Sequence, residues 1–322
     1  MKILITGAAG FIGSHLAEYL TKQGHEVTAF VRYNSSSSWG WLDRSVYKRD
    51  MRVVSGDIRD MDSVSRAMQG AEAVFHLAAL IGIPYSYVSP LAYIKTNVEG
   101  SYNVFESARN LGVRRVVHTS TSEIYGTAQY VPIDEKHPVN PQSPYAASKS
   151  AADQLALSYY RSFGTPISVV RPFNTYGPRQ SARAIIPTVI GQILAGNKEL
   201  RLGNLAPTRD LNFVTDTVNG FVHVGLHDDA IGRVTNLGTG KEISIGDLVH
   251  KIAKNIGAEV SVVQDKARLR PEKSEVERLC ADAAAAREMG WQPETTLDEG
   301  LRATIDWIQA NLDVYKPERY AV

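Results

Sequence analysis

The chain has 322 residues, of which 43% are hydrophobic and 21% charged, and its formal net charge is +1. This length can bury a substantial core in one large or two modest domains, and the near-neutral charge argues against the concentrated basic face that nucleic-acid binding needs. The apolar run at the start of the chain is too short for a membrane span, and a single cysteine, Cys280, excludes an internal disulfide and a cysteine-based metal cluster. We therefore expect a cytoplasmic protein with neither a membrane nor a nucleic-acid partner.

Short apolar runs alternate with helix-length segments through the first half of the chain. Between two of these runs, apolar residues from Val98 to Leu111 recur at helical spacing, and Gly112 follows as a stop signal. The alternation predicts an α/β fold of the Rossmann type, a doubly wound parallel sheet with helices on both faces. The predicted strands are Lys2 to Thr6, Glu26 to Val31, Arg52 to Ser55, Ala73 to Leu77, Val113 to Thr119 and Ile167 to Arg171.

After about Arg171, the regular alternation of apolar runs and helix-length segments ends. Turn-forming pairs such as Gly177-Pro178 and Arg270-Pro271 then separate shorter segments. We predict a dinucleotide-binding domain over residues 1–172 and a smaller C-terminal substrate-binding lobe that takes most of residues 173–322. The apolar run from Val234 to Leu237 predicts one more strand of the main sheet, so a segment near residues 233–240 is expected to return to the first domain.

Three glycines, in Gly7-Ala-Ala-Gly10-Phe-Ile-Gly13, lie between the first predicted strand and the helix that follows it. Glycine allows a tight turn and a close approach to a pyrophosphate, and the helix N-terminus offers free N–H groups. The order of strand, glycines and helix therefore predicts a dinucleotide cofactor. The expected cofactor contacts are Gly7, Gly10, Phe11, Ile12, Gly13, Arg32, Asp57, Ile58, Leu77, Ala78, Ala79, Tyr145 and Lys149.

The second predicted strand ends in Val31 and Arg32, where an NAD site usually carries an Asp or Glu for the ribose hydroxyls. Arg32 and the hydroxyl-rich residues 35–38 suit a 2′-phosphate, which favours NADP over NAD. The alternative is that Arg32 only stacks on the adenine. Asp57, after the third strand, is either placed to reach the adenine edge or is an ordinary turn residue.

Two further motifs carry the candidate chemistry, Tyr145-Ala-Ala-Ser-Lys149 and Ser120-Thr121-Ser122-Glu123. Helix positions i and i+4 share a face, so Lys149 should lie over Tyr145. A nearby ammonium favours phenolate, and a phenol that ordinarily titrates near pH ~10 can then act as a base closer to neutrality. Glu123 follows a predicted buried strand and is either a loop cap or a second catalytic base.

Together these motifs resemble the extended short-chain dehydrogenase/reductase superfamily and, within it, the nucleotide-sugar 4,6-dehydratases. The resemblance runs through the whole chain, in Asn97-Val98-Glu-Gly100, Ser143-Pro144-Tyr145, Arg171-Pro-Phe-Asn174, Tyr176-Gly-Pro-Arg179, Arg209-Asp210 and Arg270-Pro271-Glu272. It implies a nucleotide-sugar substrate, a tightly held and recycled NAD(P), and a homodimer built from helices near residues 91–111 and 145–163. The substrate contacts it implies are Tyr85, Ser86, Asn174, Arg179, Arg209 and Arg270.

The chemistry of this family gives Glu123 a role. When Tyr145 takes the proton of a sugar 4-hydroxyl and hydride passes to the nicotinamide, the resulting 4-ketone acidifies the hydrogen at C5. A carboxylate can then remove that hydrogen, water leaves from C6, and hydride returns there. Many family members carry Thr-Asp-Glu at this place, but Thr121-Ser122-Glu123 matches the GDP-mannose 4,6-dehydratases. The acid for the leaving hydroxyl stays open: protonated Glu123 is one candidate, with Ser122 or Thr121 positioning the hydroxyl.

Residues 33–42, 79–87 and 127–130 resemble more closely the bacterial dehydratases that act on nucleotide-linked N-acetylglucosamine in legionaminic-type sugar synthesis. This implies GDP- or UDP-N-acetylglucosamine as substrate and leaves the base open. A nucleotide-sugar 4-epimerase is the alternative, because it needs no C5 base, and a non-catalytic NAD(P) sensor is a remote one. His76 and His118 lie on apolar strands and are expected in the core, and no cluster of ligating residues predicts a metal.

Overall fold

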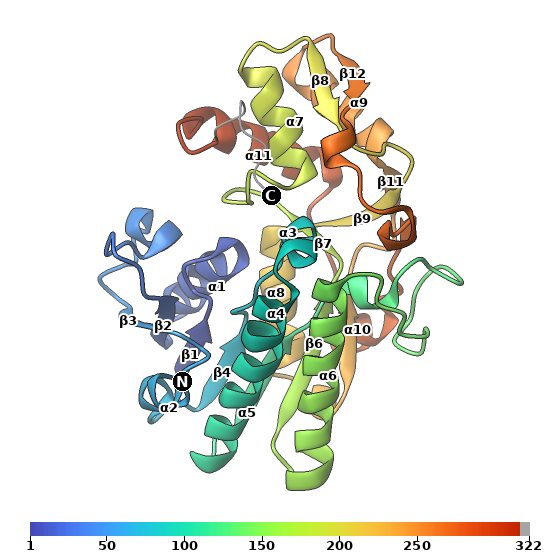
Figure 1. The fold of residues 1–322 in the computed structure, drawn as a ribbon. Helices are drawn as coiled ribbons and strands as arrows, with labels where there is room; N and C mark the ends of the chain where they lie inside the picture. The colour runs from blue at the N-terminus through green and yellow to red at the C-terminus, as the bar shows by residue number, and fades with distance from the viewer. Residues whose placement is uncertain (316–322) are drawn as a thin grey trace.

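A seven-stranded sheet in the order β10-β6-β5-β4-β1-β2-β3 forms the centre of the computed structural model, which describes residues 1–315 (Figure 1). All of its neighbouring strands pair in parallel. The chain order reverses between β1 and β4, the place where doubly wound sheets bind ligands. The predicted Rossmann-type fold is confirmed. The strands are β1 (Lys2–Thr6), β2 (Glu26–Arg32), β3 (Arg52–Gly56), β4 (Ala73–His76), β5 (Arg115–Thr119), β6 (Ile167–Pro172) and β10 (Val234–Leu237).

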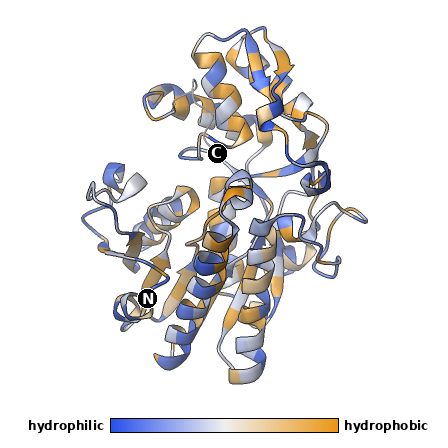
Figure 2. Cartoon of the chain, viewed as in Figure 1, coloured by the Kyte–Doolittle hydropathy of each residue, from blue (hydrophilic) through white to orange (hydrophobic). Residues whose placement is uncertain are grey.

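Helices cover both faces of this sheet, which is why its strands are apolar on both sides. On one face, Leu16 and Phe221 belong to a core shared by α1 (Phe11–Lys22) and α8 (Val214–Gly225). On the other, Phe105 and Tyr159 pack with the strands. Figure 2 shows hydrophobic residues concentrated in the strands, whereas the helices carry both kinds. The helices of the second face are α2 (Met61–Met68), α5 (Gly100–Asn110) and α6 (Pro144–Phe163).

Helix α6 has clear start and stop signals. Ser143 accepts a hydrogen bond from the Ala146 N–H at 3.1 Å, and Pro144 occupies the first turn, where its missing N–H costs nothing. Gly164 ends the helix in a left-handed conformation with φ 68°. These signals fix the helix register and, with it, the buried face that carries Tyr145 and Lys149.

A smaller lobe lies beyond the carboxyl ends of the main strands (Figure 1). Its sheet has the order β11-β9-β13, with β7 also paired to β9, and β8 pairs with β12. The lobe contains β7 (Asn174–Tyr176), α7 (Ile185–Leu194), β8 (Glu199–Leu202), β9 (Thr208–Phe213), β11 (Glu242–Ser244), α9 (Ile245–Ile256), β12 (Ser261–Gln264), β13 (Arg278–Leu279) and α11 (Leu297–Ala310). The remaining short elements are η1 (Gly40–Arg44), α3 (Ile83–Val88), α4 (Pro90–Tyr93), η2 (Ile94–Glu99), η3 (Ser122–Tyr125), η4 (Asp228–Ala230), η5 (Lys266–Arg268), η6 (Glu272–Ser274) and α10 (Ala284–Glu288).

The chain returns from the lobe to the main sheet in one continuous stretch, α8 followed by β10. Strand β10 lies within the predicted returning segment and pairs with β6, with Val234 opposite Val169. Helix α8 precedes that segment and was not included in it. It packs against α1 and β6 of the main domain, where Phe221 and Val224 are fully buried.

Exposed apolar side chains lie on the two helices expected to form a dimer. Tyr102 on α5 and Tyr160 and Phe163 on α6 are exposed. The oligomeric state stays a prediction. Within residues 1–315, no helix is both long and apolar enough to cross a membrane.

Candidate active site

A cavity of about 1040 Å³ lies between the carboxyl ends of the main strands and the smaller lobe. It brings together residues from the whole chain, because each strand of a parallel sheet delivers the residues after it to the same edge. The predicted site residues that line it are Gly7, Gly10, Phe11, Ile12, Gly13, Arg32, Asp57, Ile58, Leu77, Ala78, Ala79, Tyr85, Thr121, Ser122, Glu123, Tyr145, Lys149, Asn174, Arg209 and Arg270.

Two predicted substrate contacts lie elsewhere. Ser86 is fully buried in α3, and its hydroxyl donates to the carbonyl oxygen of Ile83 at 2.7 Å. Arg179 reaches back to α1, where it donates to Ser14 Oγ at 3.1 Å and to a carboxylate oxygen of Glu18 at 3.0 Å. Neither side chain lines the cavity, so we do not include either in the substrate site. The motifs that suggested them fix sequence position but not side-chain direction.

The glycine-rich turn has the geometry of a pyrophosphate cradle. Gly7 has φ 73°, and a Cβ there would lie 2.7 Å from the backbone nitrogen of Ala78. A Cβ at Gly13 would overlap the carbonyl oxygen of Gly7, and Gly10 precedes the first turn of α1. Larger residues would close this space, and the N-terminus of α1 supplies free N–H groups. The residues present therefore fit NAD(P).

The ribose end of the predicted cofactor site carries two arginines. Arg32 and Arg59 both line the cavity. Arg59 binds Asp57 through Nη2 at 2.6 Å and Nε at 3.0 Å, and this contact lowers the pKa of the Asp57 carboxyl. Ser36 and Ser38 donate at 2.6 Å to side chains of their own loop, which does not line the cavity. The sequence analysis missed Arg59, although a basic residue two positions after Asp57 was a visible signal.

Tyr145 and Lys149 share a buried face of α6, as the spacing predicts. Burial raises the pKa of the Tyr145 phenol and the Glu123 carboxylate raises it further, whereas a contact with Thr121 lowers it. Burial lowers the pKa of Lys149 to about 8. Burial thus disfavours the charged form of both groups, and the acidification of Tyr145 by Lys149 stays a prediction.

Glu123 lies in η3, a short turn that follows β5 after Ser120 and Thr121. The Thr121 hydroxyl accepts a hydrogen bond from the Glu123 N–H at 3.3 Å and so caps the turn. The Glu123 side chain is largely buried but lines the cavity. Burial lowers the pKa of the Arg209 guanidinium, and the charge of Glu123 raises it. The candidate C5 base and a candidate phosphate-binding cation thus line the same cavity.

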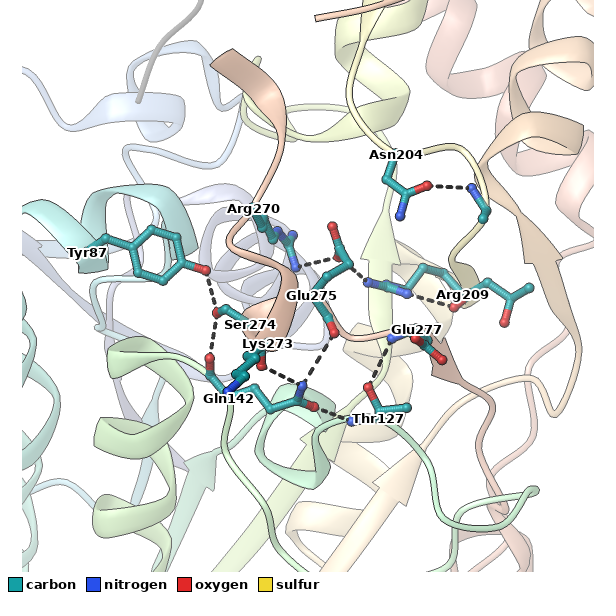
Figure 3. A network of polar contacts seen from close by, with 12 residues as sticks. Tyr87, Thr127, Gln142, Asn204, Arg209, Arg270, Lys273, Ser274, Glu275 and Glu277 are labelled. Carbon is teal, nitrogen blue, oxygen red and sulfur yellow. Dashed lines mark hydrogen bonds and ion pairs between the residues drawn. The ribbon is translucent and has the colours of Figure 1, made fainter. Parts of the chain in front are cut away.

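A third carboxylate, Glu275, lies between Arg209 and Arg270 (Figure 3). One of its oxygens is 3.6 Å from Arg209 Nη2 and 3.4 Å from Arg270 Nη1. The pair of arginines faces the cavity from two separate segments of the lobe. Sequence reasoning missed Glu275, because a carboxylate five residues after Arg270 in a loop carries no signal of its own.

The loop that carries Glu275 is held by residues of the main domain (Figure 3). Gln142 Nε2 donates to the carbonyl oxygen of Lys273 at 3.0 Å, and the Tyr87 hydroxyl lies 2.6 Å from Ser274 Oγ. These contacts hold the lobe wall of the cavity against the part of the main domain that carries α6.

Asn97 likewise holds two segments together through hydrogen bonds. It lies in the π-helical segment η2, accepts from the Leu80 N–H at 2.8 Å, and donates to the Leu80 carbonyl at 2.9 Å and to Ser148 Oγ at 2.9 Å. Single π-turns of this kind are frequent at functional sites. Asn97 therefore ties the loop after β4 to α6, next to Lys149.

A family model described as GDP-mannose 4,6 dehydratase matches residues 4–304. The chain belongs to this family. It is 35% identical over 316 residues to a UDP-glucose 4-epimerase of Mycolicibacterium smegmatis (96% of this chain, 99% of the relative). It is 34% identical over 322 residues to a dTDP-glucose 4,6-dehydratase of Streptomyces antibioticus (98% and 95%).

Solved structures give the same placement. The crystal structure of a dTDP-glucose 4,6-dehydratase from Streptomyces venezuelae with NAD bound matches with a TM-score of 0.89 at 30% identity, over 99% of this chain and 100% of that one. The fold and the family are therefore shown, and both 4,6-dehydratases and 4-epimerases are among the relatives. Among residues 1–315, no group of three or more His, Cys, Asp or Glu side chains is arranged to hold a metal ion.

The buried Lys149 should cost stability at neutral pH. Its pKa falls from an ordinary 10.5 to about 8 on folding, and each unit corresponds to about 1.4 kcal/mol. Lys149→Met should therefore raise the free energy of unfolding at pH 7 by up to about 3 kcal/mol. The gain should disappear as the pH rises from 8 to 10.5, because in that window the unfolded wild type holds a proton that the folded one has lost.

Urea denaturation at pH 7 and at pH 10.5 measures this difference. Lys22→Met is the matched control, because Lys22 is exposed and carries no burial cost. A Lys149→Met protein less stable than wild type at pH 7 would contradict the expectation.

Proposed function

We propose that the protein is a nucleotide-sugar 4,6-dehydratase that converts GDP- or UDP-N-acetylglucosamine to the 4-keto-6-deoxy sugar. The observation that carries this proposal is the position of Glu123, which lines the same cavity as Tyr145 and Lys149. A 4-epimerase needs a base only for the 4-hydroxyl, whereas a dehydratase also needs one for C5. The epimerase is the second candidate, since a relative at 35% identity carries that name.

Each residue of the site has a part in this reaction. Tyr145 accepts the proton of the sugar 4-hydroxyl. NAD(P) held by Gly7, Gly10 and Gly13 would supply the hydride acceptor for C4 and the hydride donor for C6. The 4-ketone acidifies C5, and Glu123 removes that proton. The 6-hydroxyl leaves as water once it is protonated, and we assign that proton to Glu123 in its protonated state, with Ser122 beside it in the sequence. Hydride return to C6 is accompanied by a proton to C5, which balances the proton that Tyr145 took from the 4-hydroxyl, so the product keeps the ketone and gains a C6 methyl group.

The two arginines of the lobe suit the diphosphate of the substrate. Arg209 and Arg270 converge on one carboxylate oxygen of Glu275, so their guanidinium groups already share a single anion. Guanidinium groups bind phosphate oxygens through charge-assisted hydrogen bonds. A diphosphate held here would lie in the cavity that Glu123 also lines.

Purified protein should convert one of the two nucleotide sugars to a product lighter by one water. Mass spectrometry of the reaction with GDP- and with UDP-N-acetylglucosamine measures this directly. An isobaric product would identify a 4-epimerase, and no product from any nucleotide hexose would favour the non-catalytic NAD(P) sensor.

Glu123→Gln should stop the reaction half-way. The C4 oxidation does not need the carboxylate, so reduced nicotinamide absorbing near ~340 nm should accumulate on substrate addition and persist. Tyr145→Phe is the matched comparison, because it should abolish the oxidation itself, by about 10²- to 10⁴-fold. Wild-type turnover by Glu123→Gln would show that the C5-base role is wrong.

We further propose that the resident cofactor is NADP, because β2 ends in Arg32 with no carboxylate for a ribose hydroxyl. Mass spectrometry of the nucleotide released on denaturation should therefore find NADP, and Arg32→Ser should lower the amount retained. Arg66→Ser, exposed on α2 and outside the cavity, should leave it unchanged. Release of NAD from the wild type would overturn the NADP proposal and leave the dehydratase chemistry intact.

A further inference from the structure

The turn that carries Glu123, residues 121–125, is held at both ends by buried side chains that the proposed chemistry does not use. Before the turn, Ser120 Oγ donates to Asp153 Oδ2 at 2.6 Å. At its end, the Tyr125 hydroxyl accepts from Arg171 Nη1 at 2.6 Å. Arg171 Nη2 donates to the same oxygen of Asp153 at 2.9 Å. One ion pair therefore connects the two ends of the turn.

This ion pair is almost completely removed from water. Asp153 is 1% exposed and Arg171 is 3% exposed. His118 Nε2 lies 3.2 Å from the second oxygen of Asp153, within ion-pair distance but outside hydrogen-bond geometry. Burial lowers the pKa of His118 to about 4, so this histidine is neutral at pH 7. Burial alone would raise the pKa of Asp153, but its contacts with His118, Arg171 and Ser120 bring it to about 2. The ion pair is thus charged at neutral pH.

One member of the ion pair, Asp153, lies on α6, the helix that carries Tyr145 and Lys149. Asp153 follows Lys149 by four residues and Tyr145 by eight, so the three side chains lie along one face of α6, and all three are buried. Arg171 lies on β6, the strand next to the one that leads into the turn. Asp153 and Arg171 therefore tie together three separate parts of the site: the helix, the turn and the neighbouring strand.

Stability alone is a poor reason for charges in this place. A buried ion pair is costly to desolvate, and apolar residues of similar volume often serve the fold equally well. The contacts of this pair are directed at the two ends of one short turn. We propose that the Asp153–Arg171 ion pair positions this turn so that Glu123 reaches C5 of the substrate, and that it serves the elimination more than the oxidation at C4. This inference rests on the proposed dehydratase function.

The test weakens the support of the turn without touching the reacting groups. Tyr125→Phe removes the hydroxyl at the end of the turn, Ser120→Ala removes the one at its start, and Arg171→Lys keeps the charge but loses the fork that reaches two partners. Tyr159→Phe is the matched control, because Tyr159 is also buried on α6 and its hydroxyl donates to Glu106 of α5 at 2.8 Å rather than to the turn.

Each variant is assayed with whichever of GDP- and UDP-N-acetylglucosamine the wild type dehydrates. We expect kcat to fall about 10- to 100-fold, since a misplacement of about 1 Å can cost that much, with KM within about threefold. The kinetic isotope effect of C5-deuterated substrate should rise, and reduced nicotinamide should accumulate. In Tyr159→Phe, kcat and the isotope effect should match the wild type.

Two results would overturn the positioning role. One is a kcat and a C5 isotope effect within twofold of wild type in folded Tyr125→Phe, Ser120→Ala and Arg171→Lys. The other is an equal loss of oxidation and elimination, seen as a lower kcat with no accumulation of reduced nicotinamide. If the single variants do not fold, the double variant Asp153→Leu/Arg171→Met removes both charges together and should fold. Full activity of that double variant would likewise overturn the inference.

The wild-type reaction separates this inference from the function on which it rests. If the wild type shows no loss of water and no C5 isotope effect, the dehydratase proposal fails and the positioning role fails with it. If the wild type dehydrates its substrate and the variants do the same, only the positioning role fails.

Discussion

The parallel pairing of β1, β4, β5 and β6 is the constraint on which the site depends. Thr6 lies opposite His76, His76 opposite His118, and Thr119 opposite Val170, so these strands end nearly together. Their loops therefore open on one edge, where the glycine turn, the turn of Glu123 and the start of the lobe meet. No single loop makes the cavity. A shift in the register of one strand would separate the candidate base from the candidate hydride acceptor site.

Most of this architecture could be predicted because the local signals agree with the global fold. The apolar runs predicted six strands of the main sheet with ends that differ from the observed ones by at most about two residues. Differences of this size are usual at the ends of secondary-structure elements. The glycine turn, Tyr145 and Lys149 were recognisable because their spacing carries the chemistry: cradle geometry needs glycine, and a helical pair needs a four-residue interval. Their meeting in one cavity follows from the parallel order of the strands.

The remaining features of the candidate site depend on side-chain direction and on burial, which the spacing of residues in the sequence does not determine. Arg179 has the same sequence context as a phosphate ligand but reaches back to Glu18 on α1. Asp57 was expected either to reach the adenine edge or to be an ordinary turn residue, and its carboxylate binds Arg59. Burial also raises the pKa of Tyr145 and lowers that of Lys149, which the spacing of the two residues does not reveal. A positive charge next to a phenol in water favours the phenolate. When a phenol and an ammonium are both removed from water, each shifts toward its neutral form.

The comparisons also show where the functional information lies in such a fold. An epimerase and a dehydratase are 35% and 34% identical to this chain over nearly its whole length. Overall similarity therefore does not separate the two reactions, since both need the same cofactor cradle and the same base for the 4-hydroxyl. The reactions differ only after the ketone forms, when a dehydratase must also remove a proton from C5. In the proposed function, the carboxylate in the turn after β5 would meet that need while the fold around it stays unchanged. On the same proposal, its reach would depend on a few contacts at the ends of that turn.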